Sequence, residues 1–441
     1  MNSSSAFFLT EADTERLNIR GSRDPLGLVP LWGSFGRKVV GNLTTASSTI
    51  RGFTTMLLGF HFAERLVPSG PERESVRLAV FLKFEQLAGY ARYMRNKDGQ
   101  MRGITEIKRR IDAEGGRRVS IGAARDLQIL SNQKTYGLWG LYTMPSTDSG
   151  LLQRQDLVLT PLGQELVDKE YLPILRRHGL GDGEAVQAVL LKERADLEPE
   201  GRHAKVFDAV AAIMAQRIQK REGAIYHDSL VGGGPNGLKT WQPRFAELIE
   251  RHLPDTDPFD AKSLERVITV ASGNSNDAPL ADHLQRIRKL EAVLVAMANL
   301  FGFLQDRDRA QFKDVETQIA KQWPKGLRHI DADAIDSMRG EIAKVYDDNP
   351  TGQRFAAFAA ALRSGEYGDA LTLVLDHNRF VMDARHKAQP WIILNGKKLE
   401  VRYRDESQIR LAEPKDLATA WRNGFYLNPL KQVSDELRKS A

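Results

Sequence analysis

The chain has 441 residues, enough for two to four domains, and its 41% hydrophobic and 27% charged residues are ordinary for a globular protein. Its 63 lysines and arginines face 57 acidic residues, a mild basic excess with a formal net charge of +6. There is no cysteine, which excludes disulfides, thiol catalysis, cysteine-ligated zinc and iron–sulfur clusters.

Residues 1–103 predict a polar leader up to residue 25 and then an N-terminal helical region. The first residues lack a basic start followed by an apolar run, so they do not predict a signal peptide. We expect helices over 47–66 and over 76–94, where apolar residues recur at alternating steps of three and four. The apolar stretch 53–62 is too short to span a bilayer, and we expect a cytoplasmic protein with no membrane partner.

Residues 104–178 carry the most informative pattern. Helices are predicted over 105–113, over 120–130 with Ser120 as cap, and more weakly over 135–142. Gly137 and Gly140 count against regular helix in the third. A polar turn between alternating apolar residues follows over 149–160, and Thr160-Pro161 can open a closing helix.

This order of helices, hairpin and closing helix resembles a winged-helix module. The resemblance rests on the spacing of GLLQRQDLVLTPLGQEL within SGLLQRQDLVLTPLGQELVDKEY, and it covers about a sixth of the chain. It implies a helix in the major groove and a wing beside the backbone, with double-stranded DNA as the partner. The glycines within the third helix depart from a usual recognition helix.

Basic residues surround the elements of this module. Phosphate neutralisation by such residues gives salt-dependent affinity that is independent of sequence. The candidate nucleic-acid-binding residues are Lys108, Arg109, Arg110, Arg117, Arg118, Arg125, Lys134 and Arg154. The alternative is a winged helix that serves only as a protein–protein scaffold.

Residues 184–345 predict a helical domain. The segment Gly232–Gly237 is glycine-rich, but no apolar strand precedes it and no Lys-Ser or Lys-Thr follows directly, so it predicts a turn rather than a phosphate loop. A loop is expected over 226–236. Helices are expected over 206–221, 283–305, 312–322 and 334–346.

Residues 351–441 predict a C-terminal helical region with one β-hairpin. Asn395-Gly396 between the apolar runs 391–394 and 397–403 is a strong hairpin signal. Helices are expected over 353–363, 367–374, 417–425 and 433–439.

The segment before this hairpin gives a second functional hypothesis. His377, Asp383 and His386 could hold a divalent ion against a phosphate, as in a metal-dependent nuclease. Glu400 and Arg402 on the hairpin are weak substitutes for the further acidic and basic residues that such a centre needs. A salt-bridged helix that packs on a hairpin explains the same residues.

The sequence therefore predicts a mainly α, multi-domain helical protein with a winged-helix module and a C-terminal β-hairpin. No HExxH or GxSxG pattern occurs, and no metal or cofactor is implied. We expect a non-enzymatic, DNA-associated subunit that docks partner protein subunits in a bacterial DNA-transaction or phage-defence complex. That context is an analogy. A metal-dependent nuclease and a structural protein-interaction subunit remain as alternatives.

Overall fold

The protein is mainly helical, with 63% helix and 5% strand, as the sequence predicts. The computed structural model describes residues 24–67, 73–255, 258–385, 388–404, 409–424 and 426–440. Almost all of the predicted polar leader lies outside these residues. The chain forms two compact units. Unit 1 contains the described parts of 1–36 and 259–424, and unit 2 those of 37–258 and 425–441.

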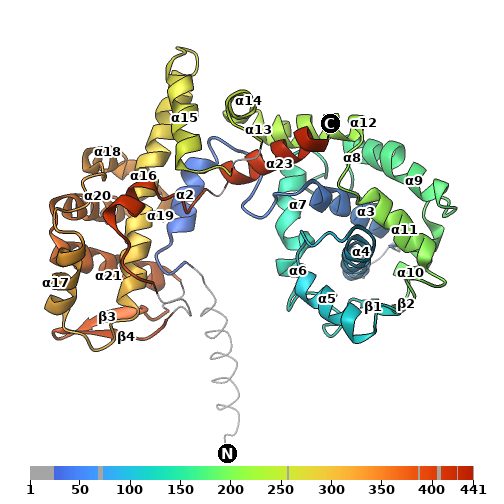
Figure 1. Cartoon of the computed structure of the whole chain (residues 1–441), viewed down its shortest axis with the longest axis horizontal. Coiled ribbons are helices and arrows are strands. Elements are labelled where there is room, and N and C mark those ends of the chain that lie inside the picture. The colour runs from blue at the N-terminus through green and yellow to red at the C-terminus, as the bar shows by residue number, and fades with distance from the viewer. Residues whose placement is uncertain are drawn as a thin grey trace, which may run out of the picture. The chain divides into compact units, whose positions relative to one another are not determined.

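Unit 2 is built around two long helices, α3 (Ile50–Leu66) and α4 (Arg73–Asn96) (Figure 1). Its small antiparallel sheet pairs β1 (Val119–Gly122) with β2 (Arg194–Leu197). Its other elements are helical: α5 (Ile104–Ala113), α6 (Gln133–Tyr136), α7 (Leu138–Asp148), α8 (Pro161–Leu166), the π-helical turn η1 (Val167–Tyr171), α9 (Leu172–Arg177), α10 (Glu184–Leu190), α11 (Ala204–Ile213), α12 (Lys220–Tyr226), the π-helical turn η2 (His227–Val231), α13 (Gly234–Gly237), α14 (Gln242–His252) and α23 (Leu427–Ser440).

Unit 1 is organised by its longest helix, α16 (Ala278–Leu304). Its sheet is the hairpin of β3 (Ile392–Asn395) and β4 (Lys398–Val401) (Figure 1). Its other helices are α2 (Leu28–Gly36), α15 (Ala261–Ser272), α17 (Phe312–Gln322), α18 (Ala332–Ser337), α19 (Arg339–Tyr346), α20 (Asn349–Ser364), α21 (Tyr367–Ala384) and α22 (Pro414–Thr419).

Helix α2 joins unit 1 although more than two hundred residues separate it from the rest of that unit. Trp32 is buried and donates from Nε1 to the carboxylate of Glu291 on α16 at 3.1 Å. The same carboxylate accepts from the backbone N–H groups of Arg422 and Asn423, at 2.7 and 2.9 Å. A buried carboxylate is stable in the fold only when donors surround it, so α2 and the loop before residue 424 complete this site.

The core of unit 2 combines aromatic packing with buried ion pairs, of which Arg51 with Glu222 is the most deeply buried. The ring of Phe60 on α3 lies 5.1 Å from those of Phe81 and Trp139. Arg51, also on α3, pairs with Glu222 on α12 at 2.5 Å, and both side chains are almost fully buried. The hydroxyl of Tyr171 at the end of η1 donates to Glu222 at 3.0 Å. A buried pair of this kind needs such added hydrogen bonds to offset desolvation.

The region predicted as a winged helix is confirmed only in part. Helix α5 and the closing helix α8 form where predicted, and the Thr160 hydroxyl accepts from the backbone N–H of Gly163 at 3.1 Å. The predicted helix over 120–130 is wrong, because Val119–Gly122 forms β1 and turns follow it. Strand β1 pairs with β2, outside the predicted module, and the hairpin over 149–160 has a single bridge, Leu152↔Leu159. The winged-helix arrangement is therefore not confirmed.

The two glycines that counted against a third helix are required by its packing. A Cβ at Gly137 would lie 2.3 Å from the Gln133 carbonyl oxygen, and one at Gly140 would lie 2.2 Å from that of Thr135. They allow α6 and α7 to meet at a tight bend. The first backbone N–H of α7, that of Leu138, donates to the Glu85 carboxylate on α4 at 2.8 Å. A side chain from another helix thus caps α7.

Outside this region, several helices match their predicted ranges and others differ. Helix α17 and the Asn395-Gly396 hairpin are confirmed, and β4 also bridges to Gln311. The predicted helix 206–221 ends at Ile213, the predicted loop 226–236 contains η2 and α13, and the predicted helix 334–346 is split at Met338. Among the described residues, none of the helices combines the length and the apolar character needed to cross a bilayer.

Candidate nucleic-acid interface

The eight cations predicted to bind DNA all lie in unit 2, but on separate elements. Lys108, Arg109 and Arg110 lie on α5. Arg117 and Arg118 precede β1, and Arg125 lies in the turns that follow it. The remaining two, Lys134 on α6 and Arg154 on the hairpin after α7, belong to other parts of the unit. The local ion pairs decide which of these charges are available to a ligand.

Arg109 and Arg110 share one carboxylate, that of Glu106 on the preceding turn, which offsets one of their two positive charges. Each lies 2.6 Å from its Oε1 atom. Hydrogen bonds from Arg109 first, and then from Arg110, lower the pKa of Glu106 to about 2 despite some desolvation. Arg110 also donates to the backbone carbonyl oxygens of Asp126, Leu127 and Gln128, at 2.9, 2.6 and 2.8 Å. Its guanidinium therefore holds the turns after β1 in place.

Arg154, predicted at the tip of the wing, is also compensated. It pairs with Asp148 at the end of α7, whose side chain is 7% exposed. Burial raises the pKa of that carboxyl, and the charge of Arg154 opposes the shift. Asp148 also accepts from the Asn236 side chain at 2.7 Å. These contacts tie Arg154 to α7 and α13.

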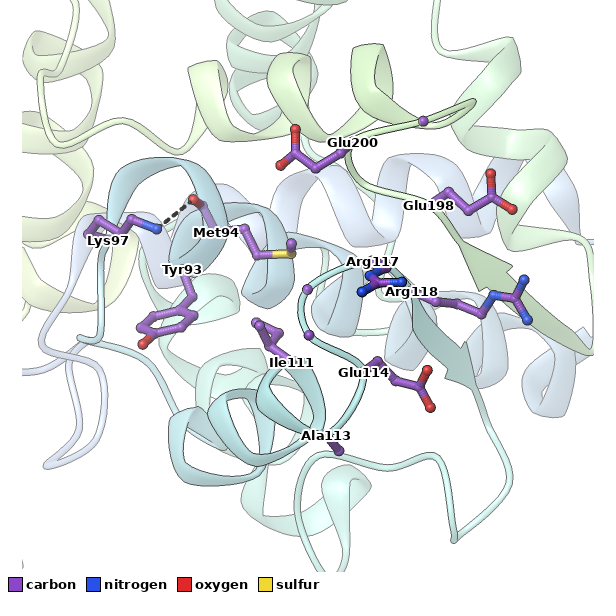
Figure 2. Close-up of a pocket in the computed structure, with 13 residues that line it drawn as sticks. Tyr93, Met94, Lys97, Ile111, Ala113, Glu114, Arg117, Arg118, Glu198 and Glu200 are labelled. Atoms are coloured by element: carbon purple, nitrogen blue, oxygen red, sulfur yellow. Dashed lines mark hydrogen bonds between the residues drawn. The ribbon is translucent and has the colours of Figure 1, made fainter.

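Arg117 and Arg118, the two cations before β1, line an open groove of about 940 Å³ (Figure 2). Its walls are the C-terminal ends of α4 and α5, the loop 114–118 and the loop 198–201. The two loops lie at one end of the β1–β2 ladder, where Val119 pairs with Leu197. Residues far apart in the sequence are brought together at this groove by the sheet.

Two of the acidic residues that line the groove already have cationic partners. Glu200 pairs with Arg95 at 2.5 Å, and Glu198 lies 3.5 Å from Arg202. Glu114 is exposed and has no ion-pair partner among the described residues. One carboxylate in the groove is therefore uncompensated.

Three cations that line the groove have no carboxylate within 4 Å in the described parts of the chain: Lys97, Arg117 and Arg118. All three are exposed. Within the described residues, Lys97 donates only to the backbone carbonyl of Met94, at 3.2 Å. Arg118 helps to lower the pKa of Asp196, which is set first by the hydrogen bond from Ser120. Among the described residues that line the groove, three unpaired cations therefore face one unpaired carboxylate, Glu114.

Beside these charges the groove has an apolar floor. Met94 and Ile111 are half-buried and lie between the charged walls in Figure 2. Tyr93 forms one side, and the Lys108 ammonium lies 5.3 Å from the centre of its ring. Lys108 thus adds a fourth cation next to the groove, although it does not line it.

Comparisons of this chain with models of protein families, with curated protein sequences and with solved structures find no match. The functional assignment therefore rests on the geometry of the groove and on the charges around it.

The alternative site over His377, Asp383 and His386 has a different environment. His377 is buried on α21, with Nε2 2.8 Å from the Leu26 carbonyl oxygen and the ring of Phe355 at 5.0 Å. Burial lowers its pKa to about 4, so the ring is neutral near pH 7. Asp383 is exposed, and His386 lies outside the described residues. No group of three metal-binding side chains occurs in the part of the chain that the structure describes.

Sequence reasoning missed half of the groove. Tyr93 lies at the end of the predicted helix 76–94 and Lys97 lies just beyond it, and neither is a candidate site residue. The strand Arg194–Leu197 is not predicted. Val119-Ser-Ile-Gly122 alternates apolar and small or polar residues, a period of two that indicates a strand. Gly115-Gly116 before it indicates a turn. The strand and the turn therefore have local sequence signals, but no local signal indicates that β1 pairs with β2.

Proposed function

We propose that this chain is a non-enzymatic, DNA-associated subunit of a multi-protein complex, and that it binds DNA phosphates at the groove described above. One observation carries the proposal: Lys97, Arg117 and Arg118 line the groove without carboxylate partners among the described residues, whereas two of its acids, Glu198 and Glu200, are paired. Uncompensated lysines and arginines on one face are the usual electrostatic footprint of a nucleic-acid-binding protein.

Existing ion pairs reduce the number of cations that can bind a phosphate without losing a partner. Arg109, Arg110 and Arg154 hold neighbouring carboxylates, so a phosphate would have to displace an existing partner to bind them. Arg117, Arg118 and Lys97 have no such partner to displace among the described residues. Arg125 and Lys134 are also exposed and outside the ion pairs of the described residues, but they do not line the groove. The proposal therefore gives the binding role to the groove rather than to the hairpin predicted as a wing.

A salt titration tests the proposal. Fluorescence anisotropy would follow a labelled DNA duplex binding to the full chain over a range of salt concentrations. Each lost phosphate contact reduces the slope of log affinity against log salt by about 0.9, so Arg117→Ala with Arg118→Ala should flatten it by about 1.8. We expect this double variant to weaken binding at every salt concentration.

Arg109→Ala is the matched control, because it removes an exposed arginine of the same region that pairs with Glu106 and does not line the groove. We expect it to leave affinity and salt slope almost unchanged. Equal effects of the control and of the double variant, or binding that does not depend on salt, would contradict the proposal.

A second candidate is a structural subunit that binds protein through α6 and α7. Helix α7 (Leu138–Asp148), which overlaps the third predicted helix at 135–142, carries no lysine or arginine. Tyr136 and Met144 beside and on it are 54% and 45% exposed. These side chains can pack against a partner protein, and they offer no charge to a phosphate backbone. If this is the function, Met144→Glu should abolish complex formation, while Arg117→Ala with Arg118→Ala leaves it intact.

A further inference from the structure

The groove combines two chemistries that a DNA duplex does not satisfy together. Its rim carries guanidinium and ammonium groups, while its floor is formed by Met94 and Ile111 with Tyr93 at the side (Figure 2). A duplex presents phosphates outward but keeps the faces of its bases stacked inside. A single strand, by contrast, offers phosphates and the flat faces of its bases at the same time.

We propose that the groove binds a short segment of single-stranded nucleic acid. The phosphates lie along Arg117, Arg118 and Lys97, and the bases pack against Tyr93, Met94 and Ile111. This inference rests on the proposed function and adds to it the kind of nucleic acid that the groove accepts.

The dimensions of the groove agree with such a ligand. Its volume of about 940 Å³ lies near the upper end of the roughly 300–1,000 Å³ of sites for small organic ligands, so it has room for more than one nucleotide. Gly115 and Gly116 on its rim have φ of 55° and 74°, and nothing lies within 4 Å of where their Cβ atoms would be. The backbone of this rim is therefore open to close approach by a ligand.

An acidic peptide is the competing ligand, since it would also meet the arginines. Both ligands bring negative charge against Glu114, Glu198 and Glu200, but a polyglutamate chain has no flat apolar groups for the floor. A nucleic-acid strand uses both rim and floor, so base stacking separates the two ligands. The experiment must therefore separate the contribution of stacking on Tyr93 to the affinity from the contribution of the cations.

Fluorescence anisotropy of the full chain with three labelled probes of similar length makes this test: oligothymidine, a duplex and a polyglutamate peptide. We expect oligothymidine to bind about tenfold more tightly than the duplex. Tyr93→Ala should weaken oligothymidine binding about tenfold, in line with the usual contribution of one stacked base, and leave duplex binding unchanged.

Tyr93→Phe is the matched control, because it keeps the ring and should retain the affinity for oligothymidine. Met94→Gln tests the floor a second time if Tyr93→Ala does not fold, which circular dichroism would report. It should weaken oligothymidine binding and spare the duplex.

The outcomes separate the two proposals. Equal binding of oligothymidine and duplex, with no effect of Tyr93→Ala, would overturn the single-strand inference and leave the proposed function standing. Polyglutamate binding as tight as oligothymidine would also overturn it, in favour of a general polyanion site. Binding of neither nucleic acid would overturn both.

Discussion

Glu85 is the residue whose environment gives the clearest chemical consequence. It is wholly buried on α4, and its two oxygens accept from Gln133 Nε2 and from the backbone N–H of Leu138, each at 2.8 Å. Burial raises its pKa from 4.5 to about 7, and those two hydrogen bonds limit the rise because they favour the charged form. One carboxyl thus joins α4, α6 and α7 and titrates near neutrality.

The raised pKa predicts a pH-dependent stability. In the unfolded chain Glu85 loses its proton near pH 4.5, whereas in the folded protein it keeps it until about pH 7. The stabilisation that it gives is therefore complete below pH 4.5 and is lost as the pH rises through 7, a change of up to about 3 kcal/mol. Glu85→Gln lacks this titration. We expect its free energy of unfolding, measured in urea, to rise relative to wild type over this window.

Glu74→Gln provides the control for that measurement, because Glu74 lies on the same helix but its side chain is 66% exposed. Its profile should run parallel to that of the wild type. If the Glu85→Gln profile is also parallel, Glu85 does not titrate in this window.

The site residues show how far local sequence reaches. Glu106 stands three and four residues before Arg109 and Arg110, a spacing that predicts ion pairs on a helix and could have removed these arginines from the candidates. The pairing of Arg95 with Glu200 had no such signal, because it depends on where the chain folds back. Local charge patterns were readable, and long-range pairs were not.

At the scale of elements, the bend between α6 and α7 predicts that a glycine-to-alanine substitution there lowers stability, whereas the same substitution in an open helix raises it. Alanine favours helix over glycine by about 1 kcal/mol. Gly140→Ala should nevertheless destabilise unit 2 by about 1–3 kcal/mol, because the new Cβ would lie 2.2 Å from the Thr135 carbonyl oxygen. Chemical unfolding of Gly140→Ala, of the comparison variant Gly223→Ala and of the wild type would measure the change in the free energy of unfolding.

Gly223→Ala on α12 is the comparison within the same unit. Its Cβ would meet only Ile218, at an ordinary 3.6 Å, so we expect stabilisation of up to about 1 kcal/mol. Stabilisation by both substitutions would show that the bend can relax, and would contradict the packing argument.

Elements with strong local signals were predictable, and those made by tertiary contact were not. Helix α17 matches its predicted range, and the Asn395-Gly396 hairpin forms as expected. Strand β1 falls within a predicted helix because its partner, β2, lies beyond five intervening α-helices and the π-helical turn η1. A two-stranded sheet of four residues each has little local preference to report.

At the scale of the whole molecule, the two units are each made from distant parts of the chain. The sequence predicted four consecutive segments, and that division stays a prediction. Local sequence patterns do not indicate that residues 28–36 pack with α16. The buried contact between Trp32 and Glu291 joins positions that are 259 residues apart. Hydrophobic periodicity finds helices but does not say which helices share a core.

This arrangement predicts the effect of removing α2. A chain that starts at residue 37 leaves Glu291 without its Trp32 donor and exposes the apolar surface that Leu31 and Phe35 cover. We expect residues 259–424 to become sensitive to limited trypsin digestion while residues 37–255 stay resistant, as read by mass spectrometry. A chain starting at residue 24 is the control. Equal cleavage of both regions would contradict the division into units.

The interleaving also governs the order in which the protein can fold during synthesis. Unit 1 receives α2 first but must wait for Asn423, whose backbone N–H completes the donors around Glu291. Unit 2 must wait for α23, where Glu436 accepts from the Ile50 backbone and Lys431 donates to the Pro254 carbonyl. A chain whose synthesis stops before residue 423 therefore lacks a complete core in both units. Such a chain exposes apolar surface to chaperones and proteases, and neither of its units is folded.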